Sequence, residues 1–389
     1  MRILRFSAER FRNLAQASLE PCPGVNVIYG ENGQGKTNLV EGIWLFTGCR
    51  SFRTSENAEL IQRGSGKAEL AAVFESNARE QRAELRIEKR RALRLNGFEE
   101  ETPRRLLGVF PAVAFTPATL ALAQGGPGER RRFLDVALSM LRPAYAVRLS
   151  KYLKALAQRN ALLRQAAAAN ADAAALEALL LPWDETLAAE AAAIAAARRQ
   201  YLAEMIPHAQ AFYEGISGGR ERLDISFLPA GLSYEEWSEG GTADRSAAGG
   251  GTADRSAASG GTAEYLVALR RNRKSDLRRQ MTHAGPHRDD LLLTLDGVSL
   301  RSFGSQGQQR SAALALKLAE AAMLREQAEE CPVTLLDDVM SELDARRQAD
   351  LLRYLEGWQV FITCCEPSHL LHGKCGKAFE VRGGSVREI

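Results

Sequence analysis

Residues 30–37 read Gly30-Glu31-Asn32-Gly33-Gln34-Gly35-Lys36-Thr37 and match the Walker A pattern G-x-x-x-x-G-K-[ST]. Residues 25–29 before them are typical of a strand, and residues 38–45 after them are suited to a helix, which is the context that the motif requires. Backbone N–H groups of such a loop surround phosphates, the lysine contacts the β- and γ-phosphates, and the threonine hydroxyl binds Mg²⁺. The stretch therefore predicts ATP and Mg²⁺ as cofactors, with Lys36 on the phosphates and Thr37 on the metal.

A second motif lies near the other end of the chain. Residues 333–336 read as a buried apolar strand, and Asp337 and Asp338 follow directly, as in a Walker B motif. We expect Asp337 to hold Mg²⁺, directly or through water, and Asp338 to orient or deprotonate the attacking water. A helix cap would explain a single carboxylate but poorly explains two that end an apolar strand. Lys36, Asp337 and Asp338 are the predicted catalytic residues, and everything between the two motifs is inserted into one ATPase head.

Ser305-Gln306-Gly307-Gln308-Gln309-Arg310, here called the signature segment, opens a predicted helix. A small hydroxyl residue, a glycine and a helix N-terminus are suited to contact with a phosphate. Alone the hexamer is a weak signal, because Ser-capped helices are common. Its place ahead of Walker B, with Ser341-Glu342-Leu343-Asp344 following as a D-loop, strengthens it. Ser305, Gly307 and Gln308 are therefore predicted to bind nucleotide.

Composition sets the broad class of protein. The 389 residues, 45% apolar and 25% charged, are typical of a globular protein with two or three domains. The net charge of +3 does not by itself indicate nucleic acid. Local basic clusters together favour a sequence-independent surface for DNA phosphates, although each alone is more often a solvated face. These clusters are Lys89-Arg90-Arg91, Arg104-Arg105, Arg130–Arg132, Arg270-Arg271, Arg273-Lys274 and Arg278-Arg279.

The cysteines and the N-terminal residues indicate the cellular compartment. The six cysteines show no zinc-ligand spacing, which suggests thiols in a reducing cytosol. Residues 1–6 lack the apolar core of a signal peptide, and no apolar run approaches the length of a membrane span. We therefore expect a cytoplasmic protein without a membrane partner.

Two segments between the Walker motifs have a distinctive composition. Residues 129–207 are rich in Ala and Leu, with a polar break at 170–172, and predict an antiparallel helical hairpin, either a projecting arm or an ordinary helical subdomain. Residues 240–263 contain near-repeats of Gly-Thr-Ala-Asp-Arg-Ser-Ala-Ala, too polar to bury a core, and predict a flexible surface insertion. Turn signals at Asn96-Gly97 and Asp296-Gly297 predict hairpins.

These motifs together resemble the ABC-type ATPase head, and a longer set resembles the RecF family of bacterial recombination mediators across nearly the whole chain. That set comprises Phe11–Leu14, Gly30–Asn38, Ser51–Thr54, Gly125–Pro127, Arg130–Asp135, Gln158–Asn160, Gly285–Asp290 and Leu335–Asp344. The resemblance implies an α/β fold: an ABC-type ATPase head with a mostly parallel core sheet plus an inserted helical arm subdomain. The expected parts are the head at 1–135, the arm with its insertion at 136–284, and the rest of the head at 285–389. The chain departs from the family pattern at Ala118-Thr119 and at Cys364-Cys365.

The resemblance also implies a function. The family binds DNA in an ATP-dependent way, has weak, DNA-stimulated ATPase activity and forms an ATP-dependent homodimer, in which the signature of one subunit contacts the γ-phosphate held by the other. It acts with RecO and RecR where duplex meets single-stranded DNA and helps RecA to load. The nucleotide-binding residues expected on this basis are Gly30, Glu31, Asn32, Gly33, Gln34, Gly35, Lys36, Thr37, Asn38, Arg12, Asn13, Ser305, Gly307 and Gln308.

Other classes of protein share single motifs with this chain. An SMC-type structural chromosome protein shares the head but needs a far longer heptad arm than residues 140–206 permit. A transporter ATPase keeps its signature much nearer Walker A, and a small-molecule kinase has no use for the signature segment. His287 and Arg288 are equally suited to a site role and to a structural role.

Overall fold

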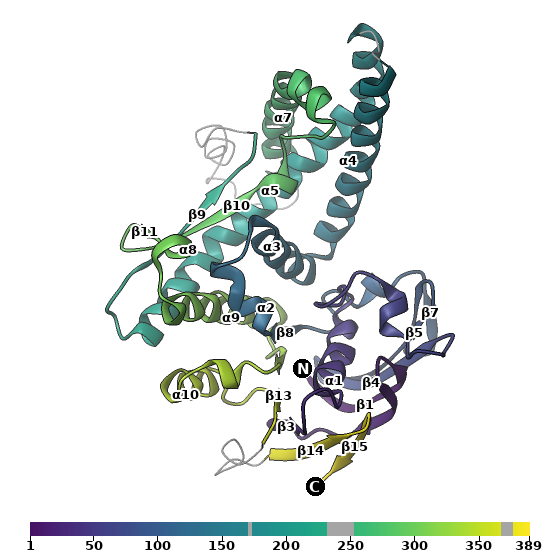
Figure 1. The fold of residues 1–389 in the computed structure, drawn as a ribbon, viewed down its shortest axis with the longest axis vertical. Helices are drawn as coiled ribbons and strands as arrows, with labels where there is room; N and C mark the ends of the chain where they lie inside the picture. Colours follow the sequence, from purple (N-terminus) through teal and green to yellow (C-terminus); the bar gives the residue numbers. More distant parts are fainter. Residues whose placement is uncertain (170–172, 232–252, 367–375) are drawn as a thin grey trace. The chain divides into compact units, whose positions relative to one another are not determined.

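The computed structural model describes residues 1–169, 173–231, 253–366 and 376–389. They form two compact units, each described here by itself (Figure 1). The head unit comprises Met1–Gln124, Pro207–Leu223 and Leu300–Ile389, and the arm unit comprises Gly125–Ile206 and Asp224–Ser299. This division differs from the expected boundaries at 135 and 284, and it assigns residues 207–223 to the head.

The first sheet of the head unit carries the nucleotide motifs. Its order is β15-β14-β3-β13-β12-β8, and only the outer pair β14–β15 is antiparallel. The central strands are almost entirely buried, as expected for parallel strands covered on both faces. The predicted mostly parallel core sheet is therefore confirmed. Its strands are β3 (Val25–Tyr29), β8 (Ala112–Phe115), β12 (Val333–Leu336), β13 (Val360–Cys364), β14 (Gly376–Arg382) and β15 (Ser385–Glu388).

The second sheet of the head unit is antiparallel, in the order β2-β1-β4-β5-β6-β7. Buried and part-exposed residues alternate along β4, so one face packs inward. Asn96 and Gly97 both have positive φ, 51° and 87°, which confirms the predicted tight turn between β6 and β7. The strands are β1 (Arg2–Phe11), β2 (Leu14–Leu19), β4 (Ala68–Ser76), β5 (Arg79–Ile87), β6 (Arg91–Leu95) and β7 (Phe98–Glu100).

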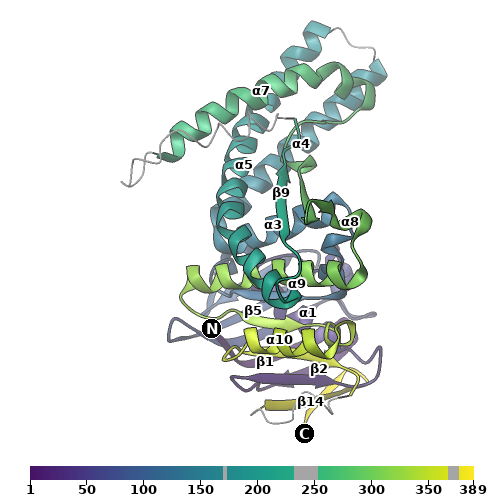
Figure 2. The same ribbon diagram turned by 90° about the vertical axis from the view of Figure 1, so that its left-hand side faces the viewer.

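Helices of the head unit lie beside its sheets (Figure 2). The longest that lies wholly within it is α9 (Gln306–Ala328), which is buried along most of its length, as its alanine-rich sequence allows. The others are α1 (Lys36–Trp44), α2 (Pro117–Leu120), α8 (Leu300–Phe303) and α10 (Ala345–Tyr354). Short 3-10 turns are η1 (Leu45–Thr47), η2 (Asn57–Leu60), η3 (Pro103–Leu106), η4 (Ala121–Ala123) and η6 (Met340–Glu342).

The arm unit is mainly helical. It contains α3 (Pro127–Leu141), α4 (Pro143–Ala169), α7 (Ala253–Arg279), the turn η5 (Pro286–Arg288) and the sheet β11-β10-β9. Helix α5 (Ala173–Ser217) contributes its residues up to 206 to this unit and continues into the head unit. The small sheet consists of β9 (Leu223–Leu228), β10 (Asp290–Leu295) and β11 (Val298–Ser299).

The predicted helical hairpin is present in the arm unit. Leu163 and Ala166 near the end of α4 pack against Leu176 and Leu180 near the start of α5, with Leu277 of α7 beside them. The second helix ends at Ser217 rather than near residue 207. Residues 232–252, which contain much of the predicted flexible insertion, lie outside the described residues. The rest of that insertion, residues 253–263, is instead the start of α7, because the near-repeat is rich in alanine and continues into a helix-forming sequence.

Across the described ranges of the chain, no helix combines the length and apolarity needed to cross a membrane.

Candidate nucleotide-binding site

The Walker A loop connects the end of β3 to the start of α1. Gly30, Gly33 and Gly35 have φ of 149°, 80° and 119°, a backbone conformation that L side chains rarely adopt. A Cβ atom on Gly35 would also lie 2.7 Å from the Asn13 side-chain oxygen. The buried Lys36 side chain turns back over the loop, and its Nζ donates to the carbonyl oxygens of Gly30 at 2.7 Å and Glu31 at 3.0 Å. The Lys36 cation thus lies over the loop, and its contact with phosphates stays a prediction.

Neighbouring residues brace this loop from two sides. Asn13 donates from Nδ2 to the Gly33 carbonyl at 3.0 Å, and its Oδ1 accepts from Asn38 Nδ2 at 2.7 Å. On the other side, the Gln34 side chain accepts the backbone N–H of Gly383 at 2.7 Å. The structure therefore places Asn13 and Asn38 at the loop and in contact with each other, and their binding of nucleotide stays a prediction.

The two Walker motifs meet at the carboxyl end of the parallel sheet. Thr37 Oγ1 donates to Asp337 Oδ1 at 2.9 Å, and Thr363 Oγ1 at the end of β13 donates to the same oxygen at 3.0 Å. Strand β13 lies between β3 and β12, which is why a threonine at its end reaches both motifs. Burial raises the pKa of the Asp337 carboxyl above its ordinary value, and the two threonine hydrogen bonds partly oppose this rise.

Asp338 occupies a special backbone position. Its φ of 52° is left-handed, and its N–H donates to Thr363 Oγ1 at 2.8 Å. Its carbonyl accepts from Ser341 Oγ at 2.8 Å, which ties Walker B to the D-loop. Sequence analysis did not predict Thr363, because a threonine in a strand is ordinary and carries no signal.

Arg12 has a different partner from the one expected. Its guanidinium makes two hydrogen bonds, of 2.8 and 2.7 Å, to the buried carboxylate of Glu41 on α1. Ser51 also donates to Glu41, and Arg53 donates to Asn38 Oδ1 at 2.7 Å. Arg12 thus supports the helix behind the loop, and its contact with nucleotide stays a prediction. The role of Glu41 was also not predicted from the sequence. The only indication there is a carboxylate on an otherwise apolar helix face.

The cysteines that depart from the family pattern lie beside the Walker A loop. Cys364 ends β13, and burial raises the pKa of its thiol to about 11, so it is neutral at physiological pH. The exposed Cys365 contacts Asn32 Oδ1 through its Sγ at 3.4 Å.

The signature segment begins α9 with a capping box. Ser305 Oγ accepts the N–H of Gln308 at 3.3 Å, and Gln308 Oε1 accepts the N–H of Ser305 at 2.7 Å. Ser305 is exposed, so its hydroxyl is accessible at the helix N-terminus. An added Cβ on Gly307 would lie 3.1 Å from the Arg347 guanidinium.

Two arginines connect the signature segment to the D-loop. Arg310 of α9 donates to the Glu342 carbonyl at 2.6 Å and also to its carboxylate. Arg347 of α10 pairs with Asp344 and donates to Ser311 Oγ at 2.9 Å. The predicted Walker B, D-loop and signature elements therefore form one hydrogen-bonded assembly in the head unit.

The side chains and backbone of this site are suited to bind ATP with Mg²⁺. Thr37 and Asp337 present hard oxygen ligands of the kind that Mg²⁺ prefers. Three left-handed glycines let backbone N–H groups approach a phosphate, and α1 begins at Lys36 with its N-terminus toward the loop. The buried Asp337 charge would be compensated by a bound cation.

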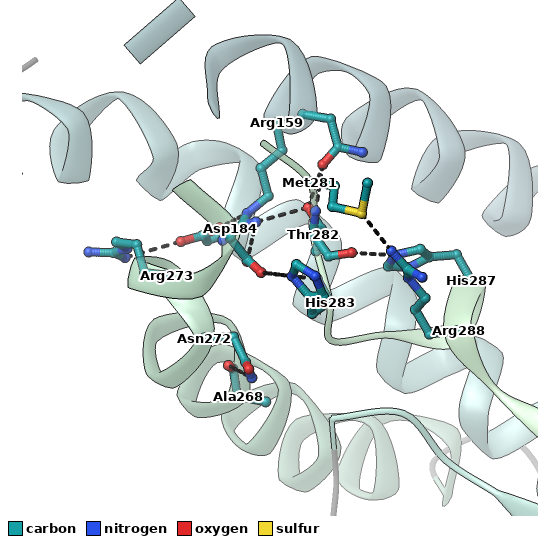
Figure 3. A network of polar contacts seen from close by, with 12 residues as sticks. Arg159, Asp184, Ala268, Asn272, Arg273, Met281, Thr282, His283, His287 and Arg288 are labelled. Carbon is teal, nitrogen blue, oxygen red and sulfur yellow. Dashed lines mark hydrogen bonds and ion pairs between the residues drawn. The ribbon is translucent and has the colours of Figure 1, made fainter. Parts of the chain in front are cut away.

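Other residues of the family pattern belong to a polar network inside the arm unit (Figure 3). The fully buried Arg159 donates from Nε to Asp184 at 2.7 Å and from Nη1 to Asp276 at 2.7 Å and Thr282 at 2.8 Å. The Asn160 side-chain oxygen accepts from the Thr282 backbone at 2.8 Å. This network holds α4, α5 and α7 together.

The residues of η5 have structural partners too. His287 lies between the Tyr152 hydroxyl, 2.6 Å from Nδ1, and the Thr282 carbonyl, 3.0 Å from Nε2. Burial lowers the pKa of His287 to about 4. The exposed Arg288 donates to the Met281 sulfur at 2.9 Å. Of the two roles left open for His287, these contacts favour the structural one.

Comparison with known proteins identifies the family. The sequence matches the family described as RecF/RecN/SMC N terminal domain over residues 2–381. It is 38% identical over 370 residues to a protein named DNA replication and repair protein RecF from Heliobacterium modesticaldum, covering 93% of this chain and 92% of that protein. The chain belongs to the RecF family. A protein of the same name from Chloroflexus aurantiacus is 39% identical over 360 residues, covering 88% of this chain and 87% of that protein.

Solved structures agree with this assignment. The recombination mediator protein RecF-ATPrS in the RecFOR pathway aligns with a TM-score of 0.86 at 32% identity, covering 100% of this chain and 98% of that one. RecF-ATP aligns with a TM-score of 0.84 at 32% identity, covering 100% of this chain and 97% of that one. The Smc head domain of Pyrococcus furiosus bound to ScpA aligns at 0.52 with 16% identity, covering 100% of this chain and 95% of that one, which shows a likeness of fold alone. The fold is thus an ABC-like ATPase head of the RecF and SMC kind with a helical insert.

Proposed function

We propose that the chain is an ATP-dependent DNA-binding protein of recombinational repair. It dimerises on ATP and acts in the cytoplasm at gaps where duplex meets single-stranded DNA, helping RecA to load together with RecO and RecR. The observation that carries the proposal is the convergence of Lys36, Thr37 and Asp337 at one sheet edge, in a head that also bears a capped signature helix. Membership of the RecF family supports the biological setting.

Each residue of the site has a task. Bound ATP with Mg²⁺ supplies the phosphoryl group and the negative charge that the site must stabilise. Lys36 would exchange loop carbonyls for phosphate oxygens, while Thr37 and Asp337 would hold the metal. Asp338, fixed through its N–H to Thr363, orients the attacking water. Turnover is weak and stimulated by DNA, as the family resemblance implies, and the exposed Ser305 completes the site only from a second subunit.

The DNA surface draws on fewer basic residues than the sequence suggested. Arg130 is buried and donates to Asp290 at 2.7 and 3.0 Å, and Arg273 pairs with Glu177 at 2.7 Å and with Asp184. These two serve ion pairs inside the arm unit. The exposed members of the clusters are the better candidates for DNA phosphates: Lys89, Arg90, Arg104, Arg105, Arg132, Arg270, Arg271, Lys274, Arg278 and Arg279.

A structural chromosome protein of the SMC kind is the alternative, because its head has a similar fold. An SMC-type protein needs a far longer arm than this chain has. Helix α4 has 27 residues, which at about 1.5 Å per residue spans only about 40 Å. The short arm therefore favours the mediator.

A titration of labelled gapped DNA tests the proposal. We expect ATP to strengthen binding, and affinity to fall steeply with salt and vary little with sequence, because phosphate contacts release counterions. Lys36→Ala should lose the effect of ATP and keep only residual binding. Faster RecA loading on gapped DNA with RecO and RecR present separates a mediator from an SMC-type protein. A flat salt response, or identical binding with and without ATP, would refute the proposal.

A further inference from the structure

The signature segment is held by a carboxylate from outside its own helix. Gln308 donates from Nε2 to Glu221 Oε1 at 2.6 Å. The hydroxyl of Tyr213 donates to the other carboxylate oxygen of Glu221 at 2.8 Å. Tyr213 is buried in the last turns of α5, within the head unit. The Glu221 carboxylate is therefore fixed on both of its oxygens.

The chain reaches this position by reversing at the end of α5. Gly218 and Gly219 have φ of 72° and 70°, and both of their N–H groups donate to the Glu214 carbonyl, at 2.9 and 3.0 Å. Two such left-handed residues end a helix and turn the chain back. Gln210 then donates from Nε2 to the Leu223 carbonyl at 2.9 Å, so residues 218–223 fold back along the helix.

Glu221 determines which way the Gln308 amide points. A carboxylate only accepts hydrogen bonds, so the amide nitrogen must face Glu221 and the amide oxygen must face the N–H of Ser305. In return Ser305 Oγ accepts from the Gln308 backbone at 3.3 Å. Because Ser305 Oγ is the acceptor in this bond, its own hydroxyl proton can be donated to a phosphate oxygen.

We propose that Glu221 is a positioning residue of the signature. Through Gln308 it keeps the Ser305 hydroxyl oriented as a donor toward the γ-phosphate of ATP on a second copy of this chain. This role rests on the proposed function, because the phosphate belongs to the ATP-bridged dimer. Orientation is its contribution, since a negative charge beside a phosphate is by itself unfavourable.

Two substitutions separate orientation from charge. Glu221→Gln removes the charge but keeps the geometry, because its oxygen accepts from Gln308 and its nitrogen donates to the Tyr213 oxygen. Glu221→Ala releases Gln308. We expect Glu221→Ala to weaken ATP-driven dimerisation and lower turnover about tenfold, as for one lost charged hydrogen bond. Glu221→Gln should retain most of both, and the monomer's affinity for ATP should be unchanged in both variants.

A double-mutant cycle tests whether Glu221 acts through Gln308. If Glu221 acts only through Gln308, its removal has no further effect once Gln308 is absent. The double variant Glu221→Ala/Gln308→Ala should therefore dimerise and turn over ATP as well as Gln308→Ala alone. Glu214→Ala, an exposed glutamate of the same helix end, is the matched control and should behave as wild type. Thermal melting checks that each variant folds. Tyr213→Phe, which removes only one support of Glu221, should show a smaller loss in the same direction.

Distinct results would overturn the idea. If Glu221→Gln is as impaired as Glu221→Ala, charge rather than orientation matters. Additive losses in the cycle would show that Glu221 does not act through Gln308. A wild-type chain that stays monomeric with ATP overturns the proposed function together with this role, whereas a normal wild type and an unimpaired Glu221→Ala overturn this role alone.

Discussion

Asp337 shows at the scale of one residue how stability conflicts with function. Burial raises its pKa, so keeping the carboxylate charged at neutral pH costs folding free energy. Its Oδ1 nevertheless accepts from both Thr37 and Thr363, an arrangement that an amide oxygen can also satisfy. The charge is thus useful only when a cation is bound beside it.

We predict that Asp337→Asn is at least as heat-stable as wild type at neutral pH without Mg²⁺, yet loses Mg²⁺-dependent ATP turnover at least about a hundredfold. A carboxyl whose folded pKa is raised gains stability as pH falls through that pKa, so the difference in melting temperature should shrink in acid. Asp344→Asn is the control. Its pKa is lowered, chiefly by the hydrogen bond from the Arg347 backbone, so it should bring no gain. A destabilised Asp337→Asn at neutral pH would contradict the account.

At the scale of elements, η5 shows how a partly buried histidine makes a short turn sensitive to acid. The Thr282 carbonyl only accepts, so His287 Nε2 carries the proton and Nδ1 accepts from Tyr152. Burial keeps the ring neutral by lowering its pKa to about 4. An unfolded chain would protonate it near its ordinary pKa of about 6.5.

We predict that acid weakens the protein partly through His287. Between pH about 6.5 and about 4 the unfolded chain binds the extra proton, so stability falls as pH falls through this window. His287→Gln keeps one donor and one acceptor and should flatten the decline in melting temperature, with His287→Asn as a second variant if it folds poorly. Parallel pH curves for His287→Gln and wild type would exclude this contribution.

At the scale of the whole molecule, the proposed dimer would complete the nucleotide site. Ser305 lies exposed at the start of α9, while Lys36 and Thr37 lie at the sheet edge with Walker B. A site shared between subunits makes a specific prediction for mixed variants.

We predict that Ser305→Arg binds ATP but stays monomeric, because a long cation blocks the donor at the helix N-terminus. Lys36→Ala should lose ATP binding. Mixing the two should restore one working site per heterodimer, built from the Walker A loop of the first and the signature of the second. Light scattering and ATP turnover measure this, with each variant alone as control. Normal ATP-driven dimerisation of Ser305→Arg would show that the shared site is wrong.

The sequence by itself determined the nucleotide motifs and most elements. Gly30–Thr37 and Asp337-Asp338 were recognisable because phosphate and metal chemistry demands particular residues at fixed local spacing. The parallel sheet and the Asn96-Gly97 turn followed from local patterns in the same way. Residues 253–263 were predicted to be a flexible insertion, but helix formation prevailed there over the polar repeat.

Only the tertiary structure decided which partners the charged and polar residues take. Arg12 pairs with Glu41, Arg130 with Asp290, and Gln308 with Glu221, at separations along the chain that no local pattern encodes. A lone arginine or glutamate reads as a solvated charge until folding brings its partner within hydrogen-bond distance. The physical reason is that motif chemistry is local, whereas pairing depends on which elements the sheet order and the reversal after α5 bring together.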